Sequence, residues 1–252
     1  SVPYLRKSYS LAFPRTWGIV SGMKKFLVIS PHPDDLDFGC AGTIARLVKE
    51  GNKVEELIIS DGSKGSHAVE FRGKKLVLLR EKEQGRAAKT LGVDHVYFLR
   101  EIDGEVENTK HLRKRLVAFM RQRKPEVVMS PEPFLLRTDR AGILHRDHRE
   151  AAQAVFDAVY PAVGNVSFFP ELLRKNLKPH TVQEIWFWGS LKPNLVIDIS
   201  KTIEQKIRAL LCHQTQIKDS KAVESRIREW ARNTGKKKKM KYAEGFRVLK
   251  LS

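Results

Sequence analysis

The sequence predicts a three-layer α/β/α fold of the Rossmann-like type, with a mainly parallel sheet and a functional site at the carboxyl ends of its strands. Two observations indicate this class. Short β-rich apolar runs alternate with longer segments of helical periodicity, which is the pattern of parallel strands joined by crossover helices. The first run is apolar throughout rather than alternating, as expected for a strand that is covered on both faces.

The first half of the chain shows the alternation most clearly. A strand at 26–30 is followed by a helix at 42–51, where apolar residues recur at helical spacing and a glycine ends the pattern. A second strand at 54–60 precedes a charged amphipathic helix at 76–91. The third strand, at 96–99, completes two βαβ units and predicts that the sheet starts as a parallel one.

The second half is less regular. The remaining elements expected before the last helix are a helix at 111–123, a strand at 127–129, a helix at 149–160, and strands at 184–188 and 194–199. The last helix is expected at 202–216, where Thr202 and Gln205 have the spacing of a capping box. Within it, His213 is interpreted as a packed helix residue rather than a catalytic one. We treat residues 1–22 as an N-terminal extension of uncertain role and 23–252 as a single domain.

Composition limits the class of protein. Hydrophobic residues make up 41% of the 252 positions and no apolar stretch approaches eighteen residues, so a buried core is expected and a membrane-spanning helix is not. Two cysteines, Cys40 and Cys212, are too few for a disulfide framework and suggest reduced thiols in a cytoplasmic protein.

The charge is strongly positive, with 47 Lys and Arg against 29 acidic residues and a net charge of +18. Such a charge could attract nucleic acid, an acidic membrane surface or a charged substrate. The basic residues are spread along the chain, which favours a solvated surface, and we expect no nucleic-acid partner. Peripheral contact with an acidic membrane stays open. The one dense run, 236–239, is read as an exposed turn.

A His-Pro-Asp-Asp cluster directly follows the first predicted strand, where ligands bind in open α/β sheets. His32 and Asp35 are three residues apart, so in a turn or a first helical coil both can face one point, and both are ordinary zinc ligands. Asp34 must project differently, which leaves it free as a base. The alternative is that Asp35 or Asp37 only caps the following helix.

A second cluster, His-Arg-Asp-His at 145–148, lies between the fourth strand and the following helix. It is expected at the same edge of the sheet as the first cluster. Together the two clusters supply three ligands, which leaves a fourth position open for water.

These motifs resemble the LmbE/PIG-L-like zinc-dependent N-deacetylases. The matching pieces are HPDD at 32–35 with Gly39 and Gly42, Ser60-Asp61-Gly62 with Gly65, Arg80-Glu81, Asp103-Gly104, HRDH at 145–148 and YAEGFR at 242–247. The amino-acid sequence around these motifs, including Glu132-Pro133-Phe134, is similar to that of the archaeal diacetylchitobiose deacetylases within this family. The resemblance covers about residues 24–250.

The resemblance implies chemistry for each motif. It implies three zinc ligands: His32, Asp35 and His148. Asp34 would take a proton from the attacking water and return one to the departing sugar amine. His145 would help to stabilise the oxyanion, with Asp147 fixing its tautomer and charge. The metal would lower the pKa of its water to about 7 and polarise the carbonyl.

Three further positions match substrate contacts in the family: Arg80, Asp103 and Glu132. Arg80 could instead pair with a neighbour on its own helix, and Asp103 could only shape the Asp-Gly turn. The sequence departs from the family where Ser63 replaces the acid of an SDGExG-like loop. The loop before HRDH is long and basic, with Arg137, Asp139 and Arg140, so the rim of the site is expected to differ.

The implied activity is zinc-dependent removal of acetate from a small sugar that contains N-acetylglucosamine, such as GlcNAc or diacetylchitobiose, by a homo-oligomeric enzyme. The alternative keeps the chemistry but changes the substrate to a GlcNAc-inositol lipid or a thiol-sugar precursor, for which the positive charge would help at an anionic membrane. A nucleic-acid-binding α/β protein would explain the charge but not the two His-Asp clusters.

Overall fold

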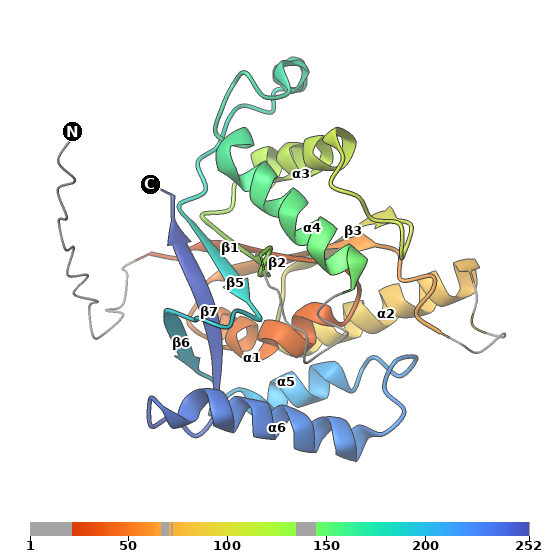
Figure 1. Cartoon of the computed structure of the whole chain (residues 1–252), viewed down its shortest axis with the longest axis vertical. Coiled ribbons are helices and arrows are strands. Elements are labelled where there is room, and N and C mark those ends of the chain that lie inside the picture. Colours follow the sequence, from red (N-terminus) through yellow and green to blue (C-terminus); the bar gives the residue numbers. More distant parts are fainter. Residues whose placement is uncertain (1–21, 67–70, 72, 135–144, 252) are drawn as a thin grey trace, which may run out of the picture.

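The computed structural model describes residues 22–66, 71, 73–134 and 145–251. Within them, a seven-stranded sheet separates two layers of helices (Figure 1). The predicted three-layer α/β/α class is therefore confirmed. The expected N-terminal extension, except Gly22, and the basic loop residues 135–144 lie outside the described residues.

The sheet is mostly parallel. Its strands are β1 (Lys25–Ser30), β2 (Lys53–Ser60), β3 (His95–Glu101), β4 (Val127–Pro131), β5 (Glu184–Trp188), β6 (Leu195–Asp198) and β7 (Ala243–Lys250). They lie in the order β3-β2-β1-β4-β5-β7-β6. The first five are parallel, and β7 runs antiparallel between β5 and β6.

Helices cover both faces of the sheet. They are α1 (Asp35–Lys49), α2 (Gly73–Leu91), α3 (Lys110–Arg123), α4 (Arg146–Asp157), α5 (Ile203–Leu210) and α6 (Ser220–Lys236), with short turns η2 (Ala158–Ala162) and η3 (Pro170–Lys175). The helices α1, α2 and α5 pack on one face, and α3 and α4 on the other (Figure 1). Val28 and Ile29 of β1 face opposite layers and both are 0% exposed, as its unbroken apolar run predicts.

The direction of winding reverses at β1. The chain adds β2 and β3 on one side of β1, then crosses over and adds β4 on the other side. The loops that leave β1 and β4 therefore diverge at their carboxyl ends and open a crevice between them. Both His-containing clusters follow these two strands, so the fold itself brings them to one place.

The structure corrects several predicted elements. The first helix begins at Asp35 rather than at 42, so the second Asp of the HPDD motif is already helical. The fourth begins at Arg146 rather than 149 and ends at Asp157. The predicted last helix ends at Leu210, and Thr202 does not cap it, because its hydroxyl donates to the Gly42 carbonyl. Neither α6 nor β7 was expected.

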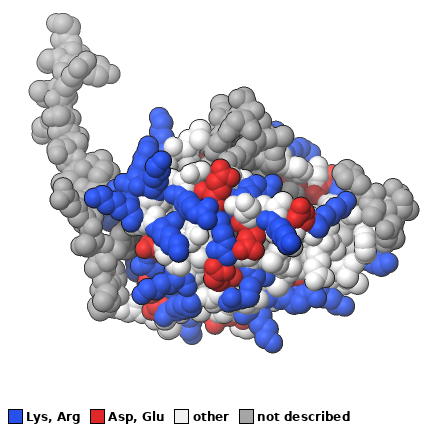
Figure 2. All heavy atoms as spheres, turned by 90° about the horizontal axis from the view of Figure 1, so that it is seen from below, with Lys and Arg blue, Asp and Glu red and all other residues white. Residues whose placement is uncertain are grey.

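The positive charge is distributed over the surface. Figure 2 shows Lys and Arg side chains spread over the face viewed from below, with acidic side chains between them. The lysines at 236–239 are exposed at the end of α6 and in the turn after it, as predicted. No helix among the described residues is long and apolar enough to cross a membrane.

Candidate active site

Three donor atoms from the two clusters meet at the crevice. His32 Nδ1 lies 3.0 Å from Asp35 Oδ2 and 3.2 Å from His148 Nε2, and the last two atoms are 3.1 Å apart. Donors about 2.0–2.1 Å from a shared tetrahedral Zn²⁺ would lie roughly 3.3 Å apart. Two imidazoles and a carboxylate in such a triangle fit a divalent transition metal. The structure thus brings together the three residues expected as ligands.

Local structure explains how two of these ligands converge. Asp35 is the first residue of α1, and its Oδ2 also accepts the His32 backbone N–H at 3.0 Å, which closes the turn after β1. His148 lies in the first turn of α4, on the far side of the crevice. Burial would raise the pKa of Asp35, but the neighbouring His148 and His32 hold it well below the ordinary value. The carboxylate is therefore ionised, as a metal ligand must be.

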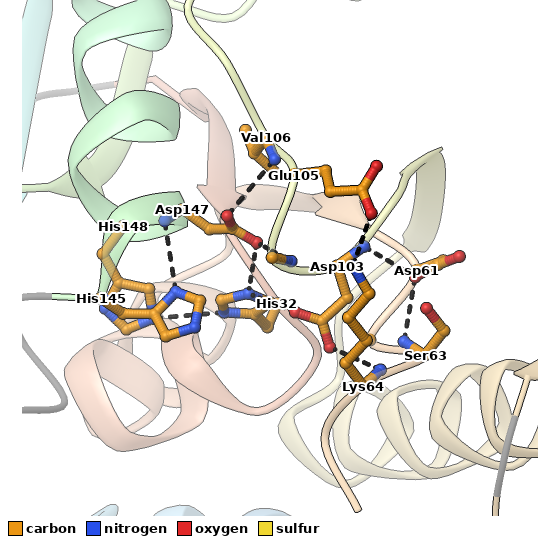
Figure 3. Close-up of polar contacts among 12 residues, drawn as sticks. His32, Asp61, Ser63, Lys64, Asp103, Glu105, Val106, His145, Asp147 and His148 are labelled. Carbon is orange, nitrogen blue, oxygen red and sulfur yellow. Dashed lines mark hydrogen bonds and ion pairs between the residues drawn. The ribbon is translucent and has the colours of Figure 1, made fainter.

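The second ring nitrogen of His32 contacts two carboxylates (Figure 3). His32 Nε2 lies 3.0 Å from Asp147 Oδ2 and 3.2 Å from Asp103 Oδ1. The Asp147 carboxylate is itself held by the backbone N–H groups of Gly104, at 2.7 Å, and Val106, at 3.3 Å. Partners of this kind orient a metal-binding imidazole and leave its other nitrogen free for the metal.

The contacts of Asp147 and Asp103 with His32 differ from the roles that the sequence led us to expect for these two residues. Asp147 was expected to fix the tautomer of His145, but its carboxylate faces His32 and only its backbone N–H donates to His145 Nδ1, at 3.2 Å. Asp103 was expected to contact a sugar or to shape its turn. In the structure, its Oδ2 accepts the Lys64 N–H at 2.9 Å while Oδ1 faces His32. The Gly104 N–H, in the loop after β3, donates to Asp147 Oδ2 and so helps to hold that carboxylate against His32.

His145 is an exposed residue beside the two histidines of the donor triangle. Its ring centroid is 5.0 Å from that of His32 and 5.4 Å from that of His148. Burial and the nearby His32 lower the pKa of His145. Since Nδ1 accepts a hydrogen bond, the neutral ring carries its proton on Nε2.

Asp34 stays outside the donor triangle. Its carboxylate lies 3.2 Å from Arg80 Nη2, and both side chains are buried. Burial raises the pKa of Asp34 to about 6, although the Arg80 guanidinium opposes the shift. Arg80 also donates to the Pro33 and Gly62 carbonyls, at 2.7 and 3.1 Å. The described contacts of Arg80 are thus with the HPDD turn and the Gly62 loop, not with a neighbour on its own helix.

Two glycines allow the guanidinium into this position. A Cβ at Gly62 would lie 2.7 Å from Arg80 Nη1, and one at Gly65 would lie 2.3 Å from it. Gly62 also has φ +65°, which side chains rarely adopt. Ser63, where the resemblance led us to expect an acid, donates its backbone N–H to Asp61 Oδ1 at 2.9 Å, which holds the loop.

The alternative that these acids only cap α1 is not what the structure shows. The capping position belongs to Asp34, whose side chain makes no capping hydrogen bond. Asp37 is fully buried, and its Oδ2 lies 2.8 Å from His213 Nε2 and 3.2 Å from Gln84 Nε2. His213 is packed, as predicted, but it lies in the turn after α5 rather than in the helix.

Sequence reasoning did not identify the buried polar cluster formed by Asp37, His213, Gln84 and Glu56. Gln84 Nε2 also donates to Glu56 Oε2 at 2.9 Å, and its Oε1 accepts the Asp34 N–H at 2.9 Å. A carboxylate in the middle of the apolar strand β2 was the available signal, because a buried acid requires a partner.

A cleft of about 820 Å³ opens from the donor triangle. Asp35, His148 and Glu132 line it, together with Trp188 of β5 and Trp230 of α6. Glu132 follows β4 and its backbone N–H donates to the Trp188 carbonyl at 3.0 Å. The structure therefore brings Glu132 to the cleft, whereas Arg80 and Asp103 are not among the residues that line it.

The fold and the site define a doubly wound α/β protein with a cluster of His and Asp side chains, able to hold a metal ion, at its topological switch point. The sequence profile of PIG-L, described as GlcNAc-PI de-N-acetylase, matches residues 27–159. The chain belongs to this family, as its motifs had suggested.

Individual relatives agree with this assignment. The chain is 37% identical over 229 residues to the diacetylchitobiose deacetylase of Thermococcus kodakarensis, covering 90% of this chain and 84% of the relative. It is 26% identical to a 1D-myo-inositol 2-acetamido-2-deoxy-alpha-D-glucopyranoside deacetylase of Mycobacteroides abscessus, over 77% and 82% of the two chains. The solved N,N'-diacetylchitobiose deacetylase of Pyrococcus horikoshii superposes with a TM-score of 0.84 at 31% identity, over 90% and 84%.

Proposed function

We propose that this protein is a zinc-dependent hydrolase that removes the N-acetyl group from a small sugar containing N-acetylglucosamine, such as GlcNAc or diacetylchitobiose, and releases acetate. The observation that carries the proposal is the triangle of donor atoms with a separate buried carboxylate beside it. The substrate class rests on the names of the relatives.

His32 Nδ1, Asp35 Oδ2 and His148 Nε2 would hold the metal. A bound Zn²⁺ supplies Lewis acidity, which lowers the pKa of a water and polarises a carbonyl. Asp147 and Asp103 accept a hydrogen bond from the Nε2–H of His32, so that its Nδ1 lone pair stays directed at the donor triangle. The same donors also suit Fe²⁺ or Co²⁺, and zinc is our choice because it matches a compact site of His and Asp ligands.

Asp34 would move the proton. It takes one from the water that attacks the acetamide carbon and delivers it to the nitrogen as the C–N bond breaks, which leaves acetate and a free amine. A base works best with a pKa near the operating pH, and burial raises the pKa of Asp34 to about 6. Arg80 keeps the carboxylate in place through the 3.2 Å contact.

His145 would stabilise the charge that develops on the carbonyl oxygen. Its Nδ1 accepts the Asp147 N–H, so Nε2 carries the proton and can donate it to that oxygen. The lowered pKa of His145 favours this neutral form. Glu132, which lines the cleft together with Asp35 and His148, is our choice for a sugar hydroxyl, whereas Arg80 and Asp103 act on Asp34 and His32.

The assembly and location are also proposals. We assign the catalytic unit to residues 23–252 as one domain. A homo-oligomer is supported by large apolar side chains on the surface, such as Phe134 at 69% and Tyr160 at 58% exposure. A cytoplasmic location is supported by Cys40 and Cys212, which are both free thiols.

The decisive experiment is a screen of N-acetylated sugars with the zinc-loaded protein. GlcNAc, diacetylchitobiose and GlcNAc-inositol would be incubated with it, and the released acetate and new amine would be measured. We expect both products in equal amounts from GlcNAc or its dimer. If only GlcNAc-inositol is turned over and the protein sediments with acidic liposomes, the substrate is a GlcNAc-inositol lipid rather than a small sugar. No acetate from any of them would refute the proposal.

A further inference from the structure

Two side chains from one turn of α2 hydrogen-bond to the peptide group between Pro33 and Asp34, one to its N–H and one to its carbonyl. The Asp34 N–H donates to Gln84 Oε1 at 2.9 Å, and the Pro33 carbonyl accepts from Arg80 Nη2 at 2.7 Å. Arg80 and Gln84 are spaced i, i+4, so they project from the same side of the helix. Arg80 is 3% exposed and Gln84 is 0% exposed, so water does not compete for these bonds.

The backbone of Asp34 has an unusual conformation. Its φ is +88° and its ψ is −32°, although it is not glycine. An Asp before a helix ordinarily has an extended backbone, and its side chain then accepts from the first turn of that helix. Here the side chain makes no such bond and faces Arg80 instead. The left-handed backbone is therefore what turns the carboxylate away from α1.

The orientation of the Gln84 amide is determined by its other partners. Its Nε2 donates to Asp37 Oδ2 at 3.2 Å and to Glu56 Oε2 at 2.9 Å. A reversed amide would place its oxygen against two carboxylate oxygens and its NH₂ against the Asp34 N–H. His213 holds Asp37 in turn, at 2.8 Å, so the acceptor that faces Asp34 is fixed from three segments of the chain.

We propose that Gln84 is a positioning residue: by accepting the Asp34 N–H, it holds Asp34 in the left-handed conformation that directs the carboxylate toward the reaction. The inference rests on the proposed function, in which Asp34 moves the proton. Without this acceptor the Asp34 N–H is buried and has no partner, which is unfavourable. The backbone then shifts toward the ordinary capping conformation and the carboxylate swings toward α1.

Two substitutions at Gln84 test the idea. Gln84→Met keeps the length and burial of the side chain but removes the acceptor, and we expect kcat to fall about 10- to 100-fold with KM and bound zinc unchanged. Gln84→Glu keeps an oxygen for the Asp34 N–H and should recover most of kcat. It also adds a carboxylate beside Asp37, so its Tm should be the lower of the two. The order of kcat is then opposite to the order of Tm.

Glu83→Gln is the matched control. Glu83 is buried next to Gln84 on α2, but its carboxylate accepts from the Thr215 N–H and hydroxyl, at 2.8 and 2.6 Å, rather than from the Asp34 N–H. We expect a lower Tm with kcat within about two-fold of wild type.

The crystal structure of Gln84→Met gives a readout that does not depend on activity. We expect φ of Asp34 to leave the positive region and its contact with Arg80 to break. A positive φ in that structure, or kcat that follows Tm through the series, would overturn the inference. Failure of the proposed function is distinguishable from failure of this inference. In the first case the wild-type protein releases no acetate, but φ of Asp34 in the Gln84→Met structure still shows whether Gln84 holds that backbone.

Discussion

The replacement Asp34→Asn separates proton transfer from metal binding. Asparagine has nearly the same size, and its Oδ1 can still accept from Arg80 Nη2, which lies 3.2 Å from the native carboxylate. The side chain is not part of the triangle formed by His32, Asp35 and His148, whose atoms are 3.0–3.2 Å apart. The variant should therefore bind zinc as the wild type does but lack the group that accepts the proton.

The expected size of the effect follows from that role. Positioned proton transfer accounts for about 10²- to 10⁴-fold in rate, and at about 1.36 kcal/mol per decade this adds roughly 2.7–5.4 kcal/mol to the barrier. Folding stability should change far less, because burial, which raises the pKa of Asp34 to about 6, already disfavours its charged form and a neutral Asn removes that cost. Arg80 loses a charged partner but retains the Pro33 and Gly62 carbonyls.

The assay measures kcat by acetate release and zinc by elemental analysis of the same samples. Asp219→Asn is the control, because it makes the same substitution far from the site. Asp219 lies at the start of α6, where its carboxylate accepts the Ala222 N–H. The control should keep wild-type kcat and zinc. A kcat for Asp34→Asn within ten-fold of wild type, with zinc bound, would refute the assignment of Asp34 as the base.

Three further substitutions test other parts of the structure. Asp147→Asn should weaken zinc binding about 10- to 100-fold in a chelator competition, because an amide cannot accept from His32 Nε2 and from two backbone N–H groups together. Gly39→Ala should lower the free energy of unfolding by about 1–3 kcal/mol, since its Cβ would lie 2.5–2.9 Å from the Trp188 indole. Glu244→Gln should lower the free energy of unfolding, measured with denaturant, by about 3–5 kcal/mol, because it leaves the buried Lys206 cation without its carboxylate partner.

Each of these variants has a matched control. Asp157→Asn neutralises an acid at the other end of α4 and should not change zinc affinity. Gly85→Ala should stabilise α2 by up to about 1 kcal/mol, because nothing lies within 4 Å of the added Cβ. Glu50→Gln breaks an exposed pair with Arg46 and should cost less than about 0.5 kcal/mol. Effects no larger than those of the controls would contradict the corresponding argument.

Hydropathy patterning predicted the parallel strands β1 and β4 most directly, because both are buried on both faces and read as short unbroken apolar runs. The antiparallel strand β7 was missed for the opposite reason. Its Gly245 and its charged residues give a weak β signal, and it becomes a strand because β5 and β6 supply partners on both sides. The helix α6 did carry a signal, with Ile227 and Ala231 at helical spacing and both buried, but the surrounding charges obscured it.

At the site, chain-local motifs were the most informative. The expected ligands lie in two short segments that follow β1 and β4, so predicting the sheet was enough to predict that they meet. The partners of those ligands could not be derived in this way. Asp103 and Asp147 come from separate crossovers and were assigned to a sugar and to His145, yet both contact His32. Which nitrogen a carboxylate reaches depends on side-chain direction, which spacing does not determine.

The α/β class, the strand ends at which chemistry could occur and the residue types able to hold a metal were predictable, because they follow from periodicity and from chain-local motifs. The positive-φ backbone of Asp34, its contacts with Arg80 and Gln84, and the buried acid of β2 that supports Gln84 became visible only in the folded chain. The physical reason is that buried polar groups must find partners wherever packing places them. Those partners come from segments that no local pattern connects.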